Sequence, residues 1–155
     1  MVISRLERIW LYIGGGILAV FLAVLLLDAV VEGASPPSSM QTIDPSTVLS
    51  SGQFAKPGVF QNGPHSSMVH VAAFTFGFLP SDIRVPVGNN VTFMVASRDV
   101  VHGFEIVNTD VNLMVIPGYI SQATHTFNHK GKYLILCNEY CGAGHHTMYA
   151  SLTVY

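Results

Sequence analysis

The chain has 155 residues, half of them apolar and only a tenth charged, with a net charge of −2. This length suits one domain with a modest core and one further element. Basic residues do not cluster anywhere, which excludes a surface built for nucleic acid. The apolar fraction is high for a purely water-soluble protein, so part of the chain is expected in a membrane.

The first predicted element is a transmembrane helix within residues 1–32. No charged side chain occurs from Ile9 to Leu27, and a helix of that length comes close to crossing a hydrocarbon core of ~30 Å. Arg5 and Arg8 precede the apolar run, so we expect the amino terminus in the cytoplasm and the rest of the chain outside. A cleaved signal peptide is the alternative, but its apolar core is usually only ~7–15 residues long.

Residues 33–68 are rich in Pro, Ser and Gly and show no hydrophobic period. This composition predicts an irregular connector. The sequence leaves open whether the connector is a free linker or is ordered against a partner subunit.

Short β-rich runs separated by turn residues occupy residues 69–155. The predicted strands are 69–76, 83–87, 91–97, 102–107, 111–116, 123–128, 132–137 and 148–155. Strands of this length and spacing indicate a mainly β domain, an antiparallel sandwich or barrel. Phe74, Phe76 and Phe78 recur at alternate positions, so we expect them to share one strand face, where core packing is the ordinary explanation.

Four soft or borderline metal ligands fall between the last two predicted strands: Cys137, Cys141, His145 and Met148. Thiolate and thioether ligands select reduced copper, and imidazole suits both copper oxidation states. Blue copper sites use one Cys, two His and a weak axial Met. The second Cys here allows two thiolates to bridge two copper ions.

Two further ligands are needed to complete such a pair. His102 begins a predicted strand beside a turn and is the best candidate for the second imidazole. The backbone carbonyl of Glu139 can serve the copper that lacks the Met. The three-residue gap after Cys141 favours His145 over His146 as the other imidazole ligand.

A disulfide between Cys137 and Cys141 is the structural alternative. It would make the spacing of the nearby imidazole and thioether a coincidence. A mononuclear blue copper protein is also disfavoured, because it needs only one of the two cysteines.

The pattern C-x3-C-x3-H-x2-M with an upstream Val-His-Gly-Phe resembles subunit II of haem-copper cytochrome c oxidases over the whole of 69–155. A single membrane helix is most similar to the B family of these oxidases. The resemblance implies a cupredoxin-like Greek-key fold and a binuclear CuA centre of two copper ions. The implied ligands are His102, Cys137, the Glu139 carbonyl, Cys141, His145 and Met148.

The same resemblance implies that electrons enter a membrane-bound terminal oxidase through this chain. They would come from a cytochrome c and pass to haem in a multi-span subunit I. Oxygen would be reduced to water there, coupled to proton pumping, so no catalytic residue is expected on this chain. The implied location is the plasma membrane of a prokaryote, single-pass, with the C-terminal domain on the periplasmic or extracellular side.

Three finer expectations also rest on the resemblance. Phe74, Phe76 and Phe78 would form an aromatic surface where cytochrome c docks. Glu139 would also help to hold a Mg²⁺ ion. Glu7 would lie at the mouth of a proton path, and the alternative is a solvated acid at the helix end.

Other functions fit the sequence less well. A membrane-tethered copper electron carrier or copper-delivery protein working alone is the main alternative, and co-purification with a haem-bearing partner would discriminate. Nitrous oxide reductase shares the ligand pattern but needs a large propeller domain, for which 155 residues leave no room. A quinol oxidase subunit of this fold would lack the ligands.

Overall fold

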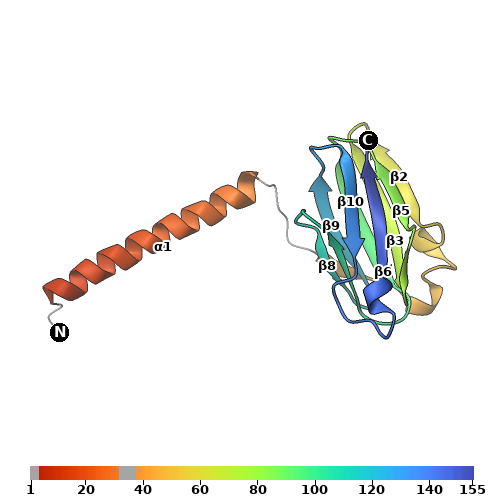
Figure 1. Cartoon of the computed structure of the whole chain (residues 1–155), viewed down its shortest axis with the longest axis horizontal. Helices are drawn as coiled ribbons and strands as arrows, with labels where there is room; N and C mark the ends of the chain where they lie inside the picture. The colour runs from red at the N-terminus through yellow and green to blue at the C-terminus, as the bar shows by residue number, and fades with distance from the viewer. Residues whose placement is uncertain (1–3, 32–37) are drawn as a thin grey trace. The chain divides into compact units, whose positions relative to one another are not determined.

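The computed structural model describes residues 4–31 and 38–155 and divides the chain into two compact units, 1–34 and 35–155. The first unit holds the helix α1 (Arg5–Val31) and the second holds the β-strands (Figure 1).

Helix α1 is 27 residues long and has no buried side chain. At 1.5 Å per residue it is ~40 Å long, and the mean hydropathy of its most apolar window is 2.5. By length and composition it is able to cross a membrane, so the expected apolar N-terminal helix is confirmed. Its first turn is closed by Ser4 and Glu7: the Ser4 amide donates to the Glu7 carboxylate (2.6 Å) and the Glu7 amide donates to Ser4 Oγ (3.3 Å). This reciprocal pair is a capping box.

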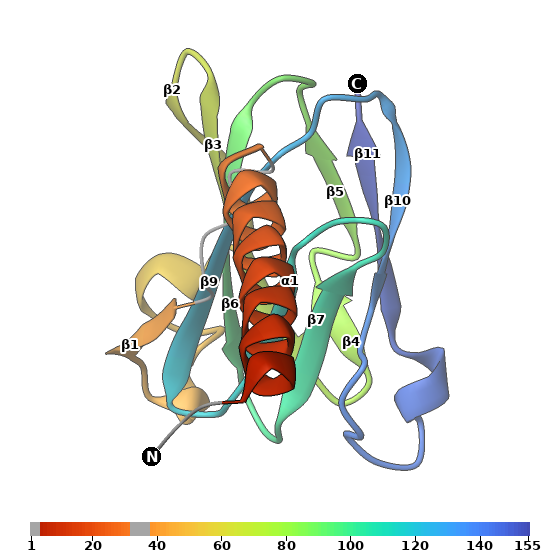
Figure 2. The same ribbon diagram turned by 90° about the vertical axis from the view of Figure 1, so that its left-hand side faces the viewer.

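The second unit is a sandwich of two β-sheets, which Figure 2 shows as separate layers. The first sheet has the order β1 (Ser38–Thr42), β9 (Tyr119–Thr126), β6 (Asn90–Ser97), β3 (Ser66–Phe74) and β2 (Gly58–Gly63), with β4 (Gly77–Leu79) paired to β3. The second sheet has the order β5 (Asp82–Val85), β11 (Tyr149–Val154), β10 (Gly131–Leu136), β7 (His102–Ile106) and β8 (Asn112–Val115).

One apolar core fills the space between the sheets. Burial alternates along β8 and β11, as expected for strands with one face inward. Large buried side chains come from both sheets, including Phe93 on β6, Phe104 on β7, Ile135 on β10 and Leu152 on β11. This core holds the ends of β7, β10 and β11 in fixed relation, and those ends carry the ligand candidates.

The expected mainly β sandwich is confirmed, but its pairing is mixed rather than wholly antiparallel. β3 pairs with β6 in parallel, and β5 pairs with β11 in parallel. Between β3 and β6 the chain crosses to the second sheet to form β5 and then returns. β6 therefore runs in the same direction as β3.

The irregular structure expected over 33–68 is wrong for much of that segment. It contributes β1, β2 and two short 3-10 helices, Pro45–Thr47 and Gly52–Phe54. Val48 and Phe54 are fully buried against the outer face of the first sheet. These elements lack a hydrophobic period because they are edge strands and single turns whose order comes from packing on β3, β6 and β9.

Candidate metal centre

Five of the six candidate ligands lie in the loop between β10 and β11, at the end of the sandwich opposite the C terminus (Figure 1), and the sixth, His102, begins β7. Cys137 follows β10 directly, and its amide donates to the Met148 carbonyl (3.3 Å). A 3-10 turn, His145–Thr147, then brings the chain back into β11, with the His145 amide bonded to the Gly142 carbonyl (3.0 Å). Gly142 has φ +128°, a backbone conformation that favours glycine. The loop therefore closes on itself without a disulfide.

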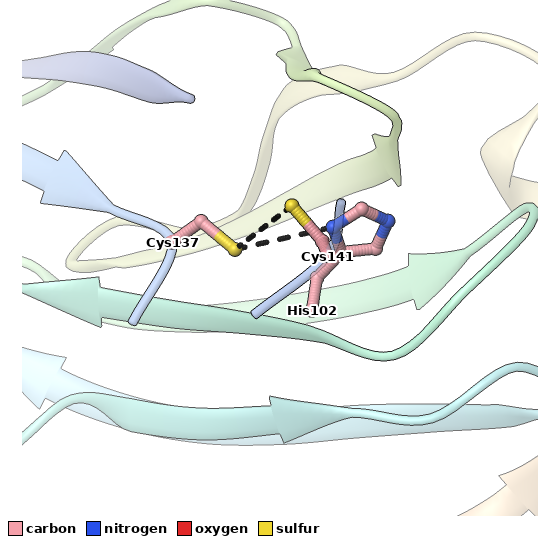
Figure 3. Close-up of side chains that lie close together, drawn as sticks. All are labelled: His102, Cys137 and Cys141. Carbon is pink, nitrogen blue, oxygen red and sulfur yellow. Dashed lines mark hydrogen bonds between the residues drawn. The ribbon is translucent and has the colours of Figure 1, made fainter. Parts of the chain in front are cut away.

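The sulfur atoms of Cys137 and Cys141 lie 3.8 Å apart (Figure 3). Both residues are buried and both are free thiols, whereas a disulfide would bring the sulfurs to ~2.0 Å. A thiolate binds a metal such as zinc at ~2.3 Å, so sulfurs at this separation are close enough for one ion to contact both. The geometry suits two thiolates that share metal.

His102 faces this sulfur pair from β7. Its Nδ1 lies 4.0 Å from Cys137 Sγ, and ligand atoms of His102, Cys137 and Cys141 all lie within 4.8 Å of one another (Figure 3). The imidazole is fully buried, and its Nε2 donates to the Asp99 carboxylate at 2.8 Å. The bond to Asp99 fixes the tautomer and leaves the Nδ1 lone pair directed at the sulfurs, an arrangement typical of metal-bound histidine.

The other three predicted ligands complete the cluster around the two sulfurs. His145 Nδ1 and Met148 Sδ each lie 3.6 Å from Cys141 Sγ. The Glu139 carbonyl oxygen accepts from the Cys137 thiol at 3.2 Å. Met148 is 2% exposed and His145 is half-buried, whereas the neighbouring His146 is exposed. The structure thus brings all six predicted ligands together and leaves His146 outside.

The charges around the site favour a cation. Burial, followed by the hydrogen bond and charge of Cys137, raises the pKa of Cys141 to about 11. Burial alone would raise the pKa of Asp99 as well, but hydrogen bonds from His102, Thr75 and Val100 lower it to about 2. The Cys141 thiol resists ionisation without a nearby positive charge, and the Asp99 carboxylate lies behind the His102 imidazole. A soft metal ion would supply positive charge to both groups.

Sequence reasoning missed Gly103 as a site residue. A Cβ on Gly103 would lie 1.9 Å from Asn138 Oδ1 and 2.7–2.8 Å from the backbone nitrogens of Asn138 and Glu139. Asn138 is held over this glycine by donating to Asn112 Oδ1 (3.0 Å). A glycine directly after His102 is a sequence signal for a close backbone contact. The sequence does not show that the contacting loop comes from 35 residues later in the chain.

The expectation that Phe74, Phe76 and Phe78 share one strand face is wrong. β3 ends at Phe74, Thr75 and Phe76 form a two-residue turn, and the chain reverses into β4 at Gly77. Phe78 packs edge-on against Phe104 in the core, Phe74 is half-buried, and only Phe76 is exposed, by 40%. The alternation is broken because two of the three residues lie on opposite sides of a hairpin turn.

Comparisons with known proteins find relatives over most of the chain. A family model described as cytochrome c oxidase subunit II, periplasmic domain, matches residues 65–154. A cytochrome c oxidase subunit 2 of Thermus thermophilus is 39% identical over 152 residues, which cover 96% of this chain and 90% of that protein. Another from the same species is 41% identical over 124 residues, covering 79% and 92%.

Solved structures give the same result. A chain of a haem-copper terminal oxidase dimer superposes with a TM-score of 0.78 and 28% identity, covering 97% of this chain and all of that one. The periplasmic domain of cytochrome oxidase subunit II from Bradyrhizobium japonicum has a TM-score of 0.54 at 18% identity, covering 57% of this chain and 83% of that one. The second match establishes the shared fold alone.

Proposed function

The chain belongs to the cytochrome c oxidase subunit II family, whose members are parts of an oxidoreductase complex, and from that premise we propose that its six clustered ligands hold a binuclear copper centre. This centre receives electrons from a cytochrome c and passes them to haem in the multi-span subunit I. Oxygen is reduced to water in that partner, with coupled proton pumping. The helix α1 anchors the chain in the plasma membrane of a prokaryote, with the copper domain on the outer side.

The observation that carries the proposal is the sulfur pair, buried and 3.8 Å apart, with an imidazole on either side. Two copper ions held by these residues would supply one-electron transfer, with the charge change spread over more metal–ligand bonds. The protein's part is to keep the ligands still. Cys137 directly follows β10, and His102 begins β7, the strand that pairs with β10. The 3-10 turn positions His145 and Met148.

Electron delivery is proposed at the exposed aromatic surface around the ligand loop. Phe76 is 40% exposed, Tyr140 within the loop is 75% exposed, and Tyr149 directly after the loop is 64% exposed. These three aromatic rings offer a partner protein an apolar docking surface beside the buried ligands. The cytochrome c surface is therefore proposed here, with Phe76 as the most exposed of Phe74, Phe76 and Phe78.

The Mg²⁺ expected at Glu139 stays a prediction. Glu139 lines a pocket of about 230 Å³ with Gly103, Asn112, Leu113, Met114 and Asn138. It is the only carboxylate among these lining residues, whereas Mg²⁺ takes six oxygen ligands. A bound Mg²⁺ would need further ligands from water and from a neighbouring subunit.

The copper centre is tested by counting metal and recording the electron paramagnetic resonance spectrum of the full chain in detergent. We expect two copper ions per chain and a spectrum of one electron shared by both. Cys141→Ser should abolish that spectrum. His145→Ala should change it, whereas His146→Ala, the matched control one residue away, should not. A single copper per chain in the unaltered protein would refute the proposal.

The oxidase assignment has a separate test. Full chain isolated from native membranes under mild detergent should arrive with a haem-bearing, multi-span partner. Isolation of the copper-loaded chain alone, with no haem absorbance in any fraction that contains it, would favour an independent carrier.

A further inference from the structure

Asp99 joins three segments of the domain through its two carboxylate oxygens. Oδ1 accepts from His102 Nε2 (2.8 Å) and from the Val100 amide (2.7 Å). Oδ2 accepts from both the amide (2.8 Å) and the hydroxyl (2.9 Å) of Thr75. The position of the His102 ring is therefore tied to the β3–β4 turn, which is 24 residues away from Asp99 in sequence.

The next residue of the same turn touches the other half of the site. The Phe76 ring fills the space that side chains on Gly142 and Gly144 would occupy: a Cβ on Gly144 would lie 2.5 Å from Phe76 Cδ2, and one on Gly142 would lie 3.0 Å from Phe76 Cε1. Both glycines lie in the loop segment between Cys141 and His145. The ring thus packs directly on the backbone that carries these two ligands.

We propose that the Thr75–Phe76 turn is a brace that sets the distance between the two ligand-bearing segments, with Thr75 acting on His102 through Asp99 and Phe76 acting on the Cys141–His145 loop. This inference rests on the proposed copper function. His102 comes from the start of β7, and the other ligands come from the β10–β11 loop. Two consecutive residues of one tight turn hold both segments.

The brace makes Thr75, Phe76 and Asp99 positioning residues that touch no metal. A hydrogen-bonded carboxylate behind a ligand histidine typically changes metal affinity 10–100-fold when it is removed. The Thr75 hydroxyl supplies one of the four bonds that fix this carboxylate, and one hydrogen bond corresponds to roughly fivefold in an equilibrium constant. We therefore expect changes of at least tenfold when Asp99 is replaced and of roughly fivefold when the Thr75 hydroxyl is removed.

The first test needs no copper. In the metal-free full chain with ¹⁵N-labelled histidine, the Nε2 proton of His102 should exchange slowly with water, because it is buried and bonded to Asp99. Asp99→Asn should make exchange at least about tenfold faster. Thr75→Val should accelerate it roughly fivefold, and Thr75→Ser, which keeps the hydroxyl, should restore the slow rate.

The second test uses the copper-loaded chain and resolves the two ligand histidines by nuclear magnetic resonance. Thr75→Val should shift the His102 signals, Phe76→Leu should shift the His145 signals, and each variant should also shift the other histidine by a smaller amount. Asp110→Asn is the matched control, because Asp110 and His125 form a separate carboxylate–imidazole pair (2.5 Å) on the same domain. It should leave both ligand histidines unchanged.

Two results would overturn the brace. One is slow His102 proton exchange that is unchanged in both Asp99→Asn and Thr75→Val. The other is a pair of variants whose effects stay confined to one histidine each, since the turn would then join nothing. Failure of the copper proposal is separate, because it appears as the wrong metal count in the unaltered chain while the metal-free exchange rates still test the brace.

Discussion

Single residues decide when the site is able to take metal, and Cys141 is the clearest case. Its pKa is raised to about 11, so in the metal-free protein the thiol is protonated at pH 7. Copper binds the thiolate, so binding releases this proton. In the unfolded chain the thiol ionises near pH ~8.5, so the metal-free fold loses stability as the pH rises between these two values.

Copper affinity should therefore rise with pH across the neutral range. Release of one proton corresponds to about a tenfold stronger apparent affinity per pH unit, as long as the pH stays below the pKa of Cys141. Competition with a chelator of known affinity at pH 6, 7 and 8 would measure this slope, and Cys141→Ser should reduce it by the contribution of this one proton. A dissociation constant that does not change over this range would contradict the assignment of Cys141 as a thiolate ligand.

Glu7 has a capping role in the structure, and the resemblance to the oxidases predicts a second role in proton uptake. It closes the capping box with Ser4, and it is also the proposed mouth of a proton path. Glu7→Gln keeps the cap, because Gln serves equally at this position, but it removes the acidic proton. Ser4→Ala breaks the cap and keeps the acid.

Oxidase assembled with Glu7→Gln should show slower proton uptake and turnover, whereas Ser4→Ala should leave both nearly unchanged. Stopped-flow pH-indicator measurements on the reconstituted complex make the comparison. Equal rates in Glu7→Gln and the unaltered oxidase would reduce Glu7 to its capping role.

Among the elements, β7 and the ligand loop approach each other so closely at Gly103 that no side chain fits between them. Gly103→Ala should push the Asn138–Glu139 backbone away from β7 and displace the Glu139 carbonyl and Cys137. Overpacking of this kind costs about 1–3 kcal/mol, measured by denaturant unfolding of the metal-free chain. The copper spectrum should change in the same variant.

Gly131→Ala in the neighbouring strand β10 is the control for that substitution. The nearest atom to its added Cβ would be Tyr133 Cε2 at 3.9 Å, an ordinary contact. It should leave the spectrum unchanged and alter stability by well under the effect of Gly103→Ala. Equal behaviour of the two variants would mean that the close approach at Gly103 does not matter.

The elements differ in how well the sequence predicts them, and the reasons are physical. Strands such as β6 and β10 carry β-branched and aromatic runs that begin at or just after a glycine, so their positions were predicted to within a few residues. β1, β2 and the buried Phe54 were missed, because their order depends on neighbours distant in sequence. The β3–β4 turn was missed because Thr75 and Phe76 have strong strand preference and no turn signature.

The site divides in the same way. Five of the six candidate ligands fall between residues 137 and 148, so their proximity follows from local spacing, and His102 was reachable because it begins a strand beside a turn. The surroundings were not predictable. The bond from Asp99 to Thr75 and the packing of Phe76 on Gly144 join segments that only the folded sandwich brings together.

At the scale of the whole molecule, charge is nearly balanced, and the surface beside the ligand loop is aromatic. Electrostatic steering needs a patch of one sign, so we expect association with cytochrome c to depend weakly on salt. Turnover of the oxidase at low cytochrome c concentration, measured between 20 and 200 mM salt, should change less than about threefold. A fall of tenfold or more would indicate a charged docking surface instead.

The order of the ligands along the chain has a consequence for biogenesis. The ribosome synthesises β1 to β10 before Cys137, the first cysteine of the cluster. His102 on β7 is therefore made before the other five candidate ligands. A nascent polypeptide therefore lacks five of the six candidate ligands until the segment after β10 has been made. Loading of the proposed copper pair has to follow synthesis of this last loop.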